Sequence, residues 1–491
     1  MTRQIRRIAV GVVVLFAALF VNLNLIVVLQ GEDLTGDERN ARGLLAEYSI
    51  PRGAMVAGIG AASEEVAGTV ETEGRLVYQR TYRDGPTYAH ITGFHSFVYG
   101  RSELESSFNA YLTGSAPEAF ARNLADLLAG RQRAGDTLQL TVEPAVQQAA
   151  ADAIAGREGA VVALDPRSGA ILALASAPSY DPNLLASHSD SEVREAWAQL
   201  GERAIDPRLN RAVRETYPPA STFKIVAAAA ALERGASGST EFPDPVRLEL
   251  PLTEASIGNF GGGVCNDGDS VTLAQAMTVS CNTTFGMIGL DLGAEQLAEQ
   301  AERFGFNEAW DLQIPDPATS VMPAELDAPS TAQSAIGQRD VRVSPLQMAL
   351  VSAAVANDGV IMEPRIVNHV EDVAGRVLAR FDPVEATLGS QPTAMSRETA
   401  AELRDMLVQA VDSGTGRNAA IDGVKVAGKT GTAQRGDGQP PTVWFTGFAP
   451  AEDPHVAVAV VVVDADAGDT GGGVAAPIAR EVMQAALTLR G

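Results

Sequence analysis

The longest uninterrupted apolar stretch lies near the N-terminus and runs from Ile8 to Leu29. It holds 22 residues without a charge, and as a helix it would extend about 33 Å and cross a bilayer. Arginines precede it and acidic residues follow it: Arg3, Arg6 and Arg7, then Glu32, Asp33 and Asp37. The positive-inside rule therefore predicts a cytoplasmic tail over 1–7, a transmembrane anchor over 8–29 and an extracytoplasmic remainder. A cleaved signal peptide is the alternative, but its apolar core would be shorter, and no clear small-x-small cleavage site follows.

Residues 30–150 show a mixed pattern of short strand-like runs without a catalytic motif. A turn is predicted at Arg83–Pro86 and a helix near 116–130. His90 and His95 raise the question of a metal site, but no cysteine or obvious carboxylate cluster accompanies them, which favours packing or surface roles. We therefore expect an N-terminal non-catalytic module over 30–150 that serves as a pedestal or an interaction domain.

The pattern changes after residue 158, where strands and helices become distinct. Two apolar runs within 159–177 flank the turn residues 165–169 and predict a β-hairpin. Further strands are predicted at 426–433, 443–450 and 455–463. Helices are predicted at 221–234, 273–292, 345–357, 397–412 and 476–489. Strands at both ends with helices between them predict an α+β domain over 151–491 whose first and last strands meet in one antiparallel sheet.

Composition excludes several classes of function. The 491-residue chain carries 37 Lys and Arg against 61 Asp and Glu, a formal charge of −24. Without a basic run, this balance disfavours nucleic acid as a partner. Two cysteines are too few for a disulfide-framed scaffold or a cysteine-rich metal site. Lysine occurs three times against 34 arginines, at Lys224, Lys425 and Lys429.

The first candidate site pairs Ser221 with Lys224. Two prolines break the chain before Ser221, and the alanine-rich run after Lys224 is a strong helix former, so both residues lie in the first turn and share a face. A serine hydroxyl is a weak nucleophile that needs a base. Lysine can supply one when burial or a second cation lowers its pKa, whereas arginine cannot. An inert pair at a helix start is the alternative.

Two further patterns lie downstream. Ser280-Cys281-Asn282 places a hydroxyl that could relay a proton beside an amide that could hold a peptide group. Local backbone hydrogen bonds explain this motif equally well when it is taken alone.

Residues 426–433 are predicted to be a strand that leads to a turn at 435–438. Lys429 and Gly431 would face one side of it, and Gly431 would leave room for a substrate to approach the backbone. Lys429, Thr430 and Thr432 supply a charge and hydroxyls suited to a carboxylate, and backbone N–H groups here could complete an oxyanion hole with that of Ser221. An edge strand with a solvated lysine is the alternative. Lys425 has no motif role and is interpreted as a solvated strand residue.

Together the three patterns are specific, because they occur in order and contain two of the three lysines. This set is the known signature of penicillin-binding proteins and serine β-lactamases. The chain resembles a class B penicillin-binding protein, most closely the actinobacterial penicillin-binding protein A type, over nearly its whole length. The resemblance also rests on Arg52-Gly53, Tyr99-Gly100, Leu104-Glu105, 112–114, 140–143, Gln147, 210–212, 336–338, 344–349 and 444–450. Ala220 departs from it, since such proteins usually have glycine there, which should tighten the turn before Ser221.

The resemblance implies a penicillin-recognising transpeptidase domain, built as an antiparallel sheet with helices on both faces, and a role for each motif residue. Ser221 would attack a stem peptide ending in D-Ala-D-Ala, with Lys224 as its base, and Ser280 would pass a proton to the departing D-Ala. Asn282 would hold the substrate amide. The remaining implied roles are carboxylate binding by Lys429, Thr430 and Thr432, and an oxyanion hole from the N–H groups of Ser221 and Thr432.

The resemblance also implies that β-lactams acylate Ser221, that no metal or organic cofactor is needed, and that a membrane glycan polymerase and division or elongation proteins are partners. D,D-carboxypeptidation remains open as the alternative reaction. A serine β-lactamase and a β-lactam-binding sensor are less favoured, because a secreted hydrolase needs neither the anchor nor the N-terminal module, and residues 1–7 are too few for a transducing portion. A bifunctional enzyme would need a further glycosyltransferase domain, for which 31–150 is too short.

Cys265 and Cys281 are 16 residues apart in a domain predicted to be exported. Two cysteines in an oxidising compartment often pair. We expect a disulfide that restrains the segment before the Ser280-Cys281-Asn282 motif, and it would contribute about 3 kcal/mol to stability on the chain-entropy model. Two free thiols, one buried beside the site, are the alternative.

Overall fold

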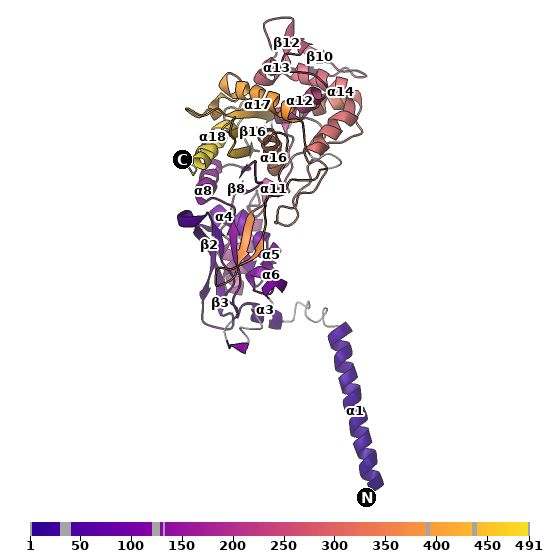
Figure 1. Ribbon diagram of the computed structural model, residues 1–491, viewed down its shortest axis with the longest axis vertical. Helices are drawn as coiled ribbons and strands as arrows, with labels where there is room; N and C mark the ends of the chain where they lie inside the picture. Colours follow the sequence, from indigo (N-terminus) through magenta and orange to yellow (C-terminus); the bar gives the residue numbers. More distant parts are fainter. Residues whose placement is uncertain are drawn as a thin grey trace.

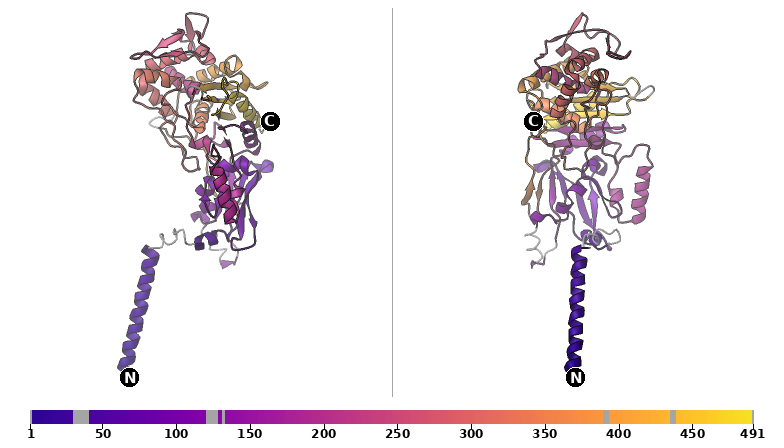
Figure 2. Two further views of the ribbon diagram at one scale, coloured as in Figure 1. Left: turned by 180° about the vertical axis from the view of Figure 1, so that it is seen from behind. Right: turned by 90° about the vertical axis from the view of Figure 1, so that its right-hand side faces the viewer.

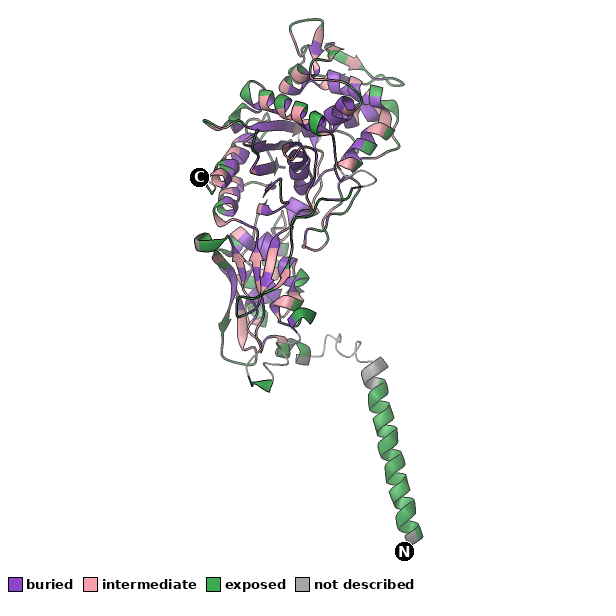
Figure 3. Cartoon of the chain, viewed as in Figure 1, coloured by how far each residue is buried: buried purple, intermediate pink, exposed green. Residues whose placement is uncertain are grey.

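The computed structural model describes residues 2–29, 41–119, 128–130, 133–388, 393–434 and 439–489. Helix α1 (Thr2–Leu29) stands apart from the rest of the chain, with its side chains exposed over 3–25 (Figures 1 and 3). Residues 3–25 are long and apolar enough to cross a membrane, with a mean hydropathy of 2.5. This helix contains the predicted anchor, while the acidic residues Glu32, Asp33 and Asp37 lie outside the described part.

The module after the anchor is a six-stranded sheet in the order β14-β13-β6-β1-β2-β3. Its pairs are antiparallel except β1 with β6. The strands are β1 (Met55–Ala57), β2 (Glu64–Glu71), β3 (Tyr78–Tyr82), β6 (Thr137–Leu140), β13 (Val367–Glu371) and β14 (Val377–Arg380). Two of the six strands, β13 and β14, therefore come from residues 367–380, far along the chain. They join this sheet through the pairing of β13 with β6.

Short helices and strands complete this part of the molecule. They are α3 (Ala41–Glu47), η1 (Gly60–Ala62), α4 (Gly85–Thr92), β4 (His95–Ser96), β5 (Gly100–Arg101), α5 (Glu103–Ser107), α6 (Asn109–Leu112) and η2 (Pro117–Ala119). The predicted turn at Arg83–Pro86 is present, but the chain enters α4 at Gly85. Most of the helix predicted near 116–130 falls on residues outside the described part.

Buried charges hold this module together. Glu105 is fully buried and accepts hydrogen bonds from Arg52 Nε at 2.5 Å and Arg80 Nε at 2.6 Å. Arg80 also donates to the carbonyl oxygen of Gly53 at 2.7 Å. Arg52-Gly53 and Leu104-Glu105, two stretches that carry the family resemblance, thus belong to one buried network.

The second sheet has five antiparallel strands in the order β15-β16-β17-β7-β8. They are β7 (Gly159–Leu164), β8 (Ile171–Ala177), β15 (Ala427–Ala433), β16 (Thr442–Ala449) and β17 (Val456–Val462). The predicted hairpin over 159–177 and the meeting of the first and last strands are confirmed. Because β15 is an edge strand, the backbone N–H and C=O groups along its outer edge have no partner strand among the described residues and can bind a ligand.

Helices cover both faces of this sheet (Figures 1 and 2). Helices α8 (Pro144–Ile154) and α18 (Ala475–Thr488) pack on one face and share a core with it. The other face packs against α16 (Pro345–Ala356) and α17 (Arg397–Asp412). Helix α12 (Lys224–Glu233) packs on α17, and α14 (Asn282–Arg303) packs on α12. This α+β arrangement is the predicted one.

The predicted helix over 273–292 is wrong as one continuous element. It divides into α13 (Leu273–Val279) and α14. The reason is Ser280, whose φ of +65° is left-handed and ends α13. The break brings Ser280 and Asn282 to a corner between two helices.

The other elements of this part are short. They are α9 (Asn183–Ala186), α10 (Asp190–Gly201), α11 (Arg211–Arg214), η3 (Ala220–Phe223), β9 (Glu241–Pro243), β10 (Arg247–Glu249), β11 (Ser256–Gly258), β12 (Ser270–Thr272), α15 (Ala328–Ala335) and η4 (Arg417–Ala419). Among them, η3 and β11 contribute directly to the site described below.

Candidate active site

A cleft of about 320 Å³ opens between the edge strand β15 and the corner of α13 and α14. The predicted residues that line it are Ser221, Ser280, Asn282, Thr430, Gly431 and Thr432. Phe260, Val279, Ile336, Gln338, Thr415 and the segment 470–472 complete its walls. Lys224 and Lys429 are fully buried behind these residues.

Ser221 lies in the 3-10 turn η3, directly before α12. Ala220, where the resemblance leads us to expect glycine, has a φ of +50°, a left-handed conformation that costs a non-glycine residue about 1–2 kcal/mol. The turn is held by a hydrogen bond from Ala220 N to the carbonyl oxygen of Gly337 at 2.9 Å. Within the described residues, Ser221 Oγ makes no side-chain hydrogen bond, and it faces the cleft.

Lys224 is the centre of the polar contacts behind the nucleophile. Its ammonium donates to Asn282 Oδ1 at 2.7 Å, to the carbonyl oxygen of Ser280 at 2.8 Å and to Ser280 Oγ at 3.3 Å. Burial lowers the pKa of Lys224 well below its usual value, and the charge of Lys429 lowers it further. A neutral amine one helical turn from Ser221 is a competent base for its hydroxyl.

Ser280 and Asn282 owe their positions to the break between α13 and α14. The left-handed Ser280 directs its carbonyl and its hydroxyl at Lys224, so the hydroxyl can carry a proton between that amine and the cleft. The Asn282 side chain is oriented from both ends, because its oxygen accepts from Lys224 and its nitrogen donates to the carbonyl oxygen of Gly258 at 3.0 Å. One N–H of that amide remains for a ligand.

Side chains of β15 alternate between two environments, as in any strand. The charge of Lys429 acts on Lys224 of α12, and Gly431 lies against the Ser221 turn, while Thr430 and Thr432 line the cleft. Thr430 Oγ1 shares a 2.6 Å hydrogen bond with Thr415 Oγ1, and Thr432 Oγ1 accepts from Gly471 N at 3.2 Å. Burial lowers the pKa of Lys429 to about 7, so this lysine can lose its charge near neutral pH.

Gly431 lines the cleft, as expected, and it also lies against the Ser221 turn. A side chain there would meet the carbonyl oxygen of Pro219 at 2.9 Å and the methyl of Thr222 at 3.3 Å. The missing side chain therefore lets the Ser221 turn pack closely on β15, and this contact sets the distance between the nucleophile and the strand edge.

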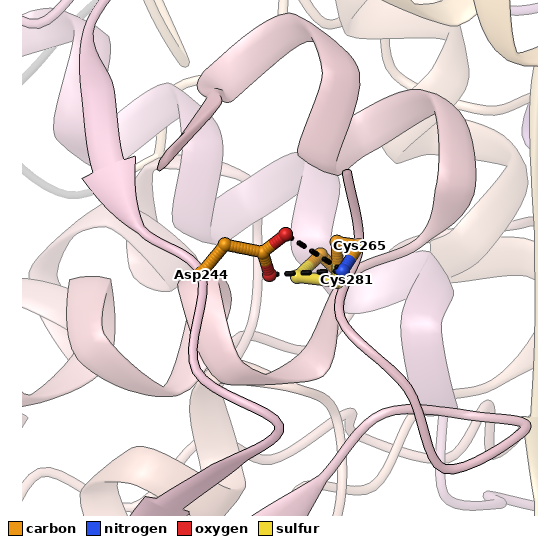
Figure 4. Close-up of side chains that lie close together, drawn as sticks. All are labelled: Asp244, Cys265 and Cys281. Carbon is orange, nitrogen blue, oxygen red and sulfur yellow. Dashed lines mark hydrogen bonds between the residues drawn. A yellow bond between two sulfur atoms is a disulfide. The ribbon is translucent and has the colours of Figure 1, made fainter. Parts of the chain in front are cut away.

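The predicted disulfide between Cys265 and Cys281 is present (Figure 4). Asp244 lies beside it and accepts hydrogen bonds from the backbone N–H of Cys265, at 2.9 and 2.8 Å to its two oxygens, and from that of Asn266 at 2.6 Å. A carboxylate and two sulfurs together suggest a metal site, but the sulfurs are bonded to each other and are not thiolates. The group therefore restrains the loop that leads to the cleft.

Sequence reasoning missed several cleft residues because no motif contains them. Thr415 and the segment 470–472 lie in loops, and their approach to β15 arises from tertiary packing. The only signal in the sequence was the glycine run at 471–473. The structure shows why glycine is needed there, because a side chain on Gly471 would lie 2.2 Å from the carbonyl oxygen of Trp444. Lys425 lies just before β15 rather than in it and forms an exposed ion pair with Asp412.

The comparisons with known proteins point to one family. The profile described as "Penicillin binding protein transpeptidase domain" matches residues 159–484, and that described as "Penicillin binding protein A dimerisation domain" matches 52–138. Peptidoglycan D,D-transpeptidase PbpA of Mycolicibacterium smegmatis is 43% identical over 505 residues, covering 99% of each chain. Its namesake from Mycobacterium tuberculosis is 40% identical over 501 residues, again covering 99% of each.

A solved structure agrees with these similarities. The ceftriaxone acyl-enzyme complex of penicillin-binding protein A from M. tuberculosis superposes with a TM-score of 0.86 at 39% identity. The match covers 90% of this chain and 100% of that one. That protein therefore shares both the fold and much of the sequence described above.

Proposed function

Because this chain belongs to the penicillin-binding protein family, we propose that it cross-links peptidoglycan stem peptides through an acyl-enzyme on Ser221. It is a peptidoglycan D,D-transpeptidase of the type whose active-site serine is acylated by β-lactams. The observation that carries the residue assignment is the contact of one buried lysine, Lys224, with both Ser280 and Asn282 behind the cleft that Ser221 enters.

Acylation begins when Lys224 in its neutral form accepts the proton of Ser221 Oγ. The oxygen then attacks the carbonyl carbon between the two D-Ala residues, and a C–O bond forms. The negative oxygen of the tetrahedral intermediate is bound by the backbone N–H groups of Ser221 and Thr432. As the C–N bond breaks, the proton moves from Lys224 through the hydroxyl of Ser280 to the departing D-Ala amine.

Deacylation reverses these proton transfers. The amine of a neighbouring stem peptide enters, and its proton passes to Lys224 as the amine attacks the ester carbonyl. The C–O bond to Ser221 breaks, the serine regains its proton, and the new amide is the cross-link. No step requires a metal or an organic cofactor. Water in place of the amine would give D,D-carboxypeptidation, which uses the same residues.

The substrate is held by groups on both sides of Ser221. Thr430 and Thr432 line the cleft and donate to the terminal carboxylate, while the positive charge of Lys429 acts from behind them. Carboxylate binding raises the pKa of Lys429 and so keeps it charged in the complex. On the opposite wall, the free N–H of Asn282 holds the amide of the stem peptide.

The test uses the full chain in detergent, with a fluorescent penicillin and a stem peptide as separate probes. We expect slow-turnover labelling by the penicillin, its abolition in Ser221→Ala, and D-Ala release from the peptide with cross-linking when an acceptor amine is present. Labelling of the Ser221→Ala variant would contradict the assignment. Rapid release of the label would favour a β-lactamase, and D-Ala release without any cross-linked product would favour a carboxypeptidase.

We also propose the placement of the chain in the cell envelope. Residues 1–7 are cytoplasmic, 8–29 anchor the chain in the membrane, 30–150 form the pedestal or interaction domain, and 151–491 form the transpeptidase domain outside the membrane. The arginines at 3, 6 and 7 support this orientation. A membrane glycan polymerase and division or elongation proteins are the expected partners. Protease added to intact spheroplasts should remove the penicillin label if the orientation is correct.

A further inference from the structure

The end of β11 forms a support for the first turn of α14. Asn259 Oδ1 accepts hydrogen bonds from the backbone N–H groups of Asn282 at 2.9 Å and Thr283 at 3.0 Å. These are two of the donors that a helix leaves unpaired at its N-terminus. The preceding carbonyl, that of Gly258, accepts from the side chain of Asn282 at 3.0 Å. Backbone and side chain of Asn282 are therefore both fixed by the pair 258–259.

Asn282 passes this restraint on to Lys224. Its Oδ1 accepts from Lys224 Nζ at 2.7 Å, so the position of the lysine amine depends on where α14 begins. A helix usually takes its capping side chain from the residue just before it. Here that residue is Cys281, which offers no side-chain cap, and Asn259 supplies the cap from a distant loop.

The capping loop is itself anchored at both ends. Asn259 Nδ2 donates to the carbonyl oxygen of Gly263 at 3.1 Å. The disulfide ties Cys265 to Cys281, next to Asn282, and Asp244 binds the backbone N–H groups of Cys265 and Asn266. The loop from β11 to the disulfide is therefore fixed to the start of α14 at both of its ends, by Asn259 and by the disulfide.

We infer that Asn259 is a positioning residue for acylation, which acts through Asn282 to hold the amine of Lys224 at Ser221. This inference rests on the proposed function, because it assigns Asn259 to the base of that reaction. Asn259 does not line the cleft and need not touch the substrate.

The test compares Asn259→Ala with Asn259→Asp by the second-order rate constant of penicillin acylation over pH 6–10. Alanine removes the acceptor, and we expect acylation to fall about tenfold or more, as misplaced catalytic groups do. Aspartate keeps the acceptor and suits a helix N-terminus. Its negative charge favours the protonated form of Lys224, so we expect the rising, acid-side limb of the profile to move to higher pH. Once Lys224 is neutral, acylation should equal that of the wild type measured at the same pH.

The pH comparison depends on what surrounds Lys224. Among the described residues, β15 presents the charge of Lys429, while the α13–α14 corner presents Ser280, Asn282 and Phe285, which do not titrate. Aspartate at 259 would therefore add a new charge of opposite sign to this environment. A residue that served stability alone would change the melting temperature without moving the pH profile.

Controls separate the possible failures. Asn357→Ala removes an asparagine that donates to Val360 at the end of α16 and lies outside the cleft, and it should acylate normally. Normal acylation by Asn259→Ala, or acylation by Asn259→Asp that stays below the wild-type value at every pH, would overturn the inference. Labelling that survives in Ser221→Ala would instead refute the proposed function and leave the Asn259 contacts unexplained.

Discussion

At the scale of single residues, the three lysines separate into two kinds. Lys425 is exposed and pairs with Asp412, as a surface arginine could. Lys224 and Lys429 are fully buried, and their pKa values are lowered chiefly by burial. Arginine stays charged at any accessible pH, so the chain keeps lysine at the two positions where losing a proton is possible.

Lys224→Arg should lose acylation although it keeps the charge, because a guanidinium cannot accept the serine proton. We expect the rate to fall by about 10²–10⁴-fold, the usual contribution of a positioned base. Labelling by a fluorescent penicillin measures this, with Lys425→Arg as the matched control that should label normally. If Lys224→Arg acylates like the wild type, Lys224 is not the base.

The pH profile of acylation should fall on its alkaline side because of Lys429. Acylation needs neutral Lys224, so it rises with pH. It also needs charged Lys429 to bind the carboxylate of the penicillin, and with a pKa of about 7 in the free protein this charge is lost above neutral pH. Lys429→Arg keeps the charge, so the alkaline fall in the second-order acylation constant should disappear. A fall that persists unchanged in a folded Lys429→Arg protein would assign it to another group.

At the scale of elements, the site depends on close backbone contacts between parts that are distant in sequence. Gly337 follows α15 and has a φ of +73°. A side chain on it would lie 2.0 Å from the carbonyl oxygen of Ala220, the residue before the nucleophile. The turn that carries Ser221 is therefore set by β15 on one side, through Gly431, and by Gly337 on the other.

Gly337→Ala should displace the Ser221 turn and lower acylation by about ten- to a hundredfold, the effect expected of a shift near 1 Å. Gly375→Ala is the matched control, because Gly375 has a φ of +76° but nothing near the added methyl. Gly375→Ala should lose about 1–2 kcal/mol of stability from left-handed strain alone, and Gly337→Ala should lose more, because the backbone of Ala220 must also shift. Measured acylation should separate them, and equal acylation by the two would contradict this role for Gly337.

The sequence predicts those elements whose signals are local. The hairpin over 159–177, the helix after Lys224 and the helices α16 and α17 follow from periodicity and turn residues and were placed within a few positions. The break at Ser280 could not be predicted, because a left-handed serine is stabilised by tertiary contacts with Lys224 rather than by its neighbours. Thr415 and Asn259 were missed for the same reason, since each contacts the motifs from a distant loop.

At the scale of the whole molecule, the anchor-side module and the transpeptidase domain share structural elements. Strands β13 and β14, from the C-terminal part, complete the N-terminal sheet. Arg214 of α11 donates to Glu103 of α5 at 2.5 Å, and α8 begins in one part and packs on the sheet of the other. The domain boundary at residue 150 stays a prediction. Because the two parts share strands and contacts, we expect them to unfold together as one cooperative unit.

Glu105 provides the test of that expectation. Burial alone would raise its pKa, but the charges of Arg52 and Arg80 outweigh burial and hold the pKa at about 2. The unfolded value is 4.5, so this carboxylate stabilises the fold fully above about pH 4.5. That stabilisation is lost as pH falls from about 4.5 to 2, and its size is of the order of 3 kcal/mol.

Glu105→Gln should therefore destabilise the full chain at pH 7 by about 3–5 kcal/mol, since it leaves two buried guanidinium groups without their carboxylate. The difference from wild type should shrink as pH falls toward 2, because a protonated glutamate resembles glutamine. Urea unfolding followed by circular dichroism at several pH values measures this, with the exposed Glu452→Gln as control. A difference that stays constant with pH would show that the charge of Glu105 is not the stabilising feature. Cooperative unfolding requires that Glu105→Gln also lower the urea midpoint for loss of penicillin labelling, since Ser221 lies in the other part.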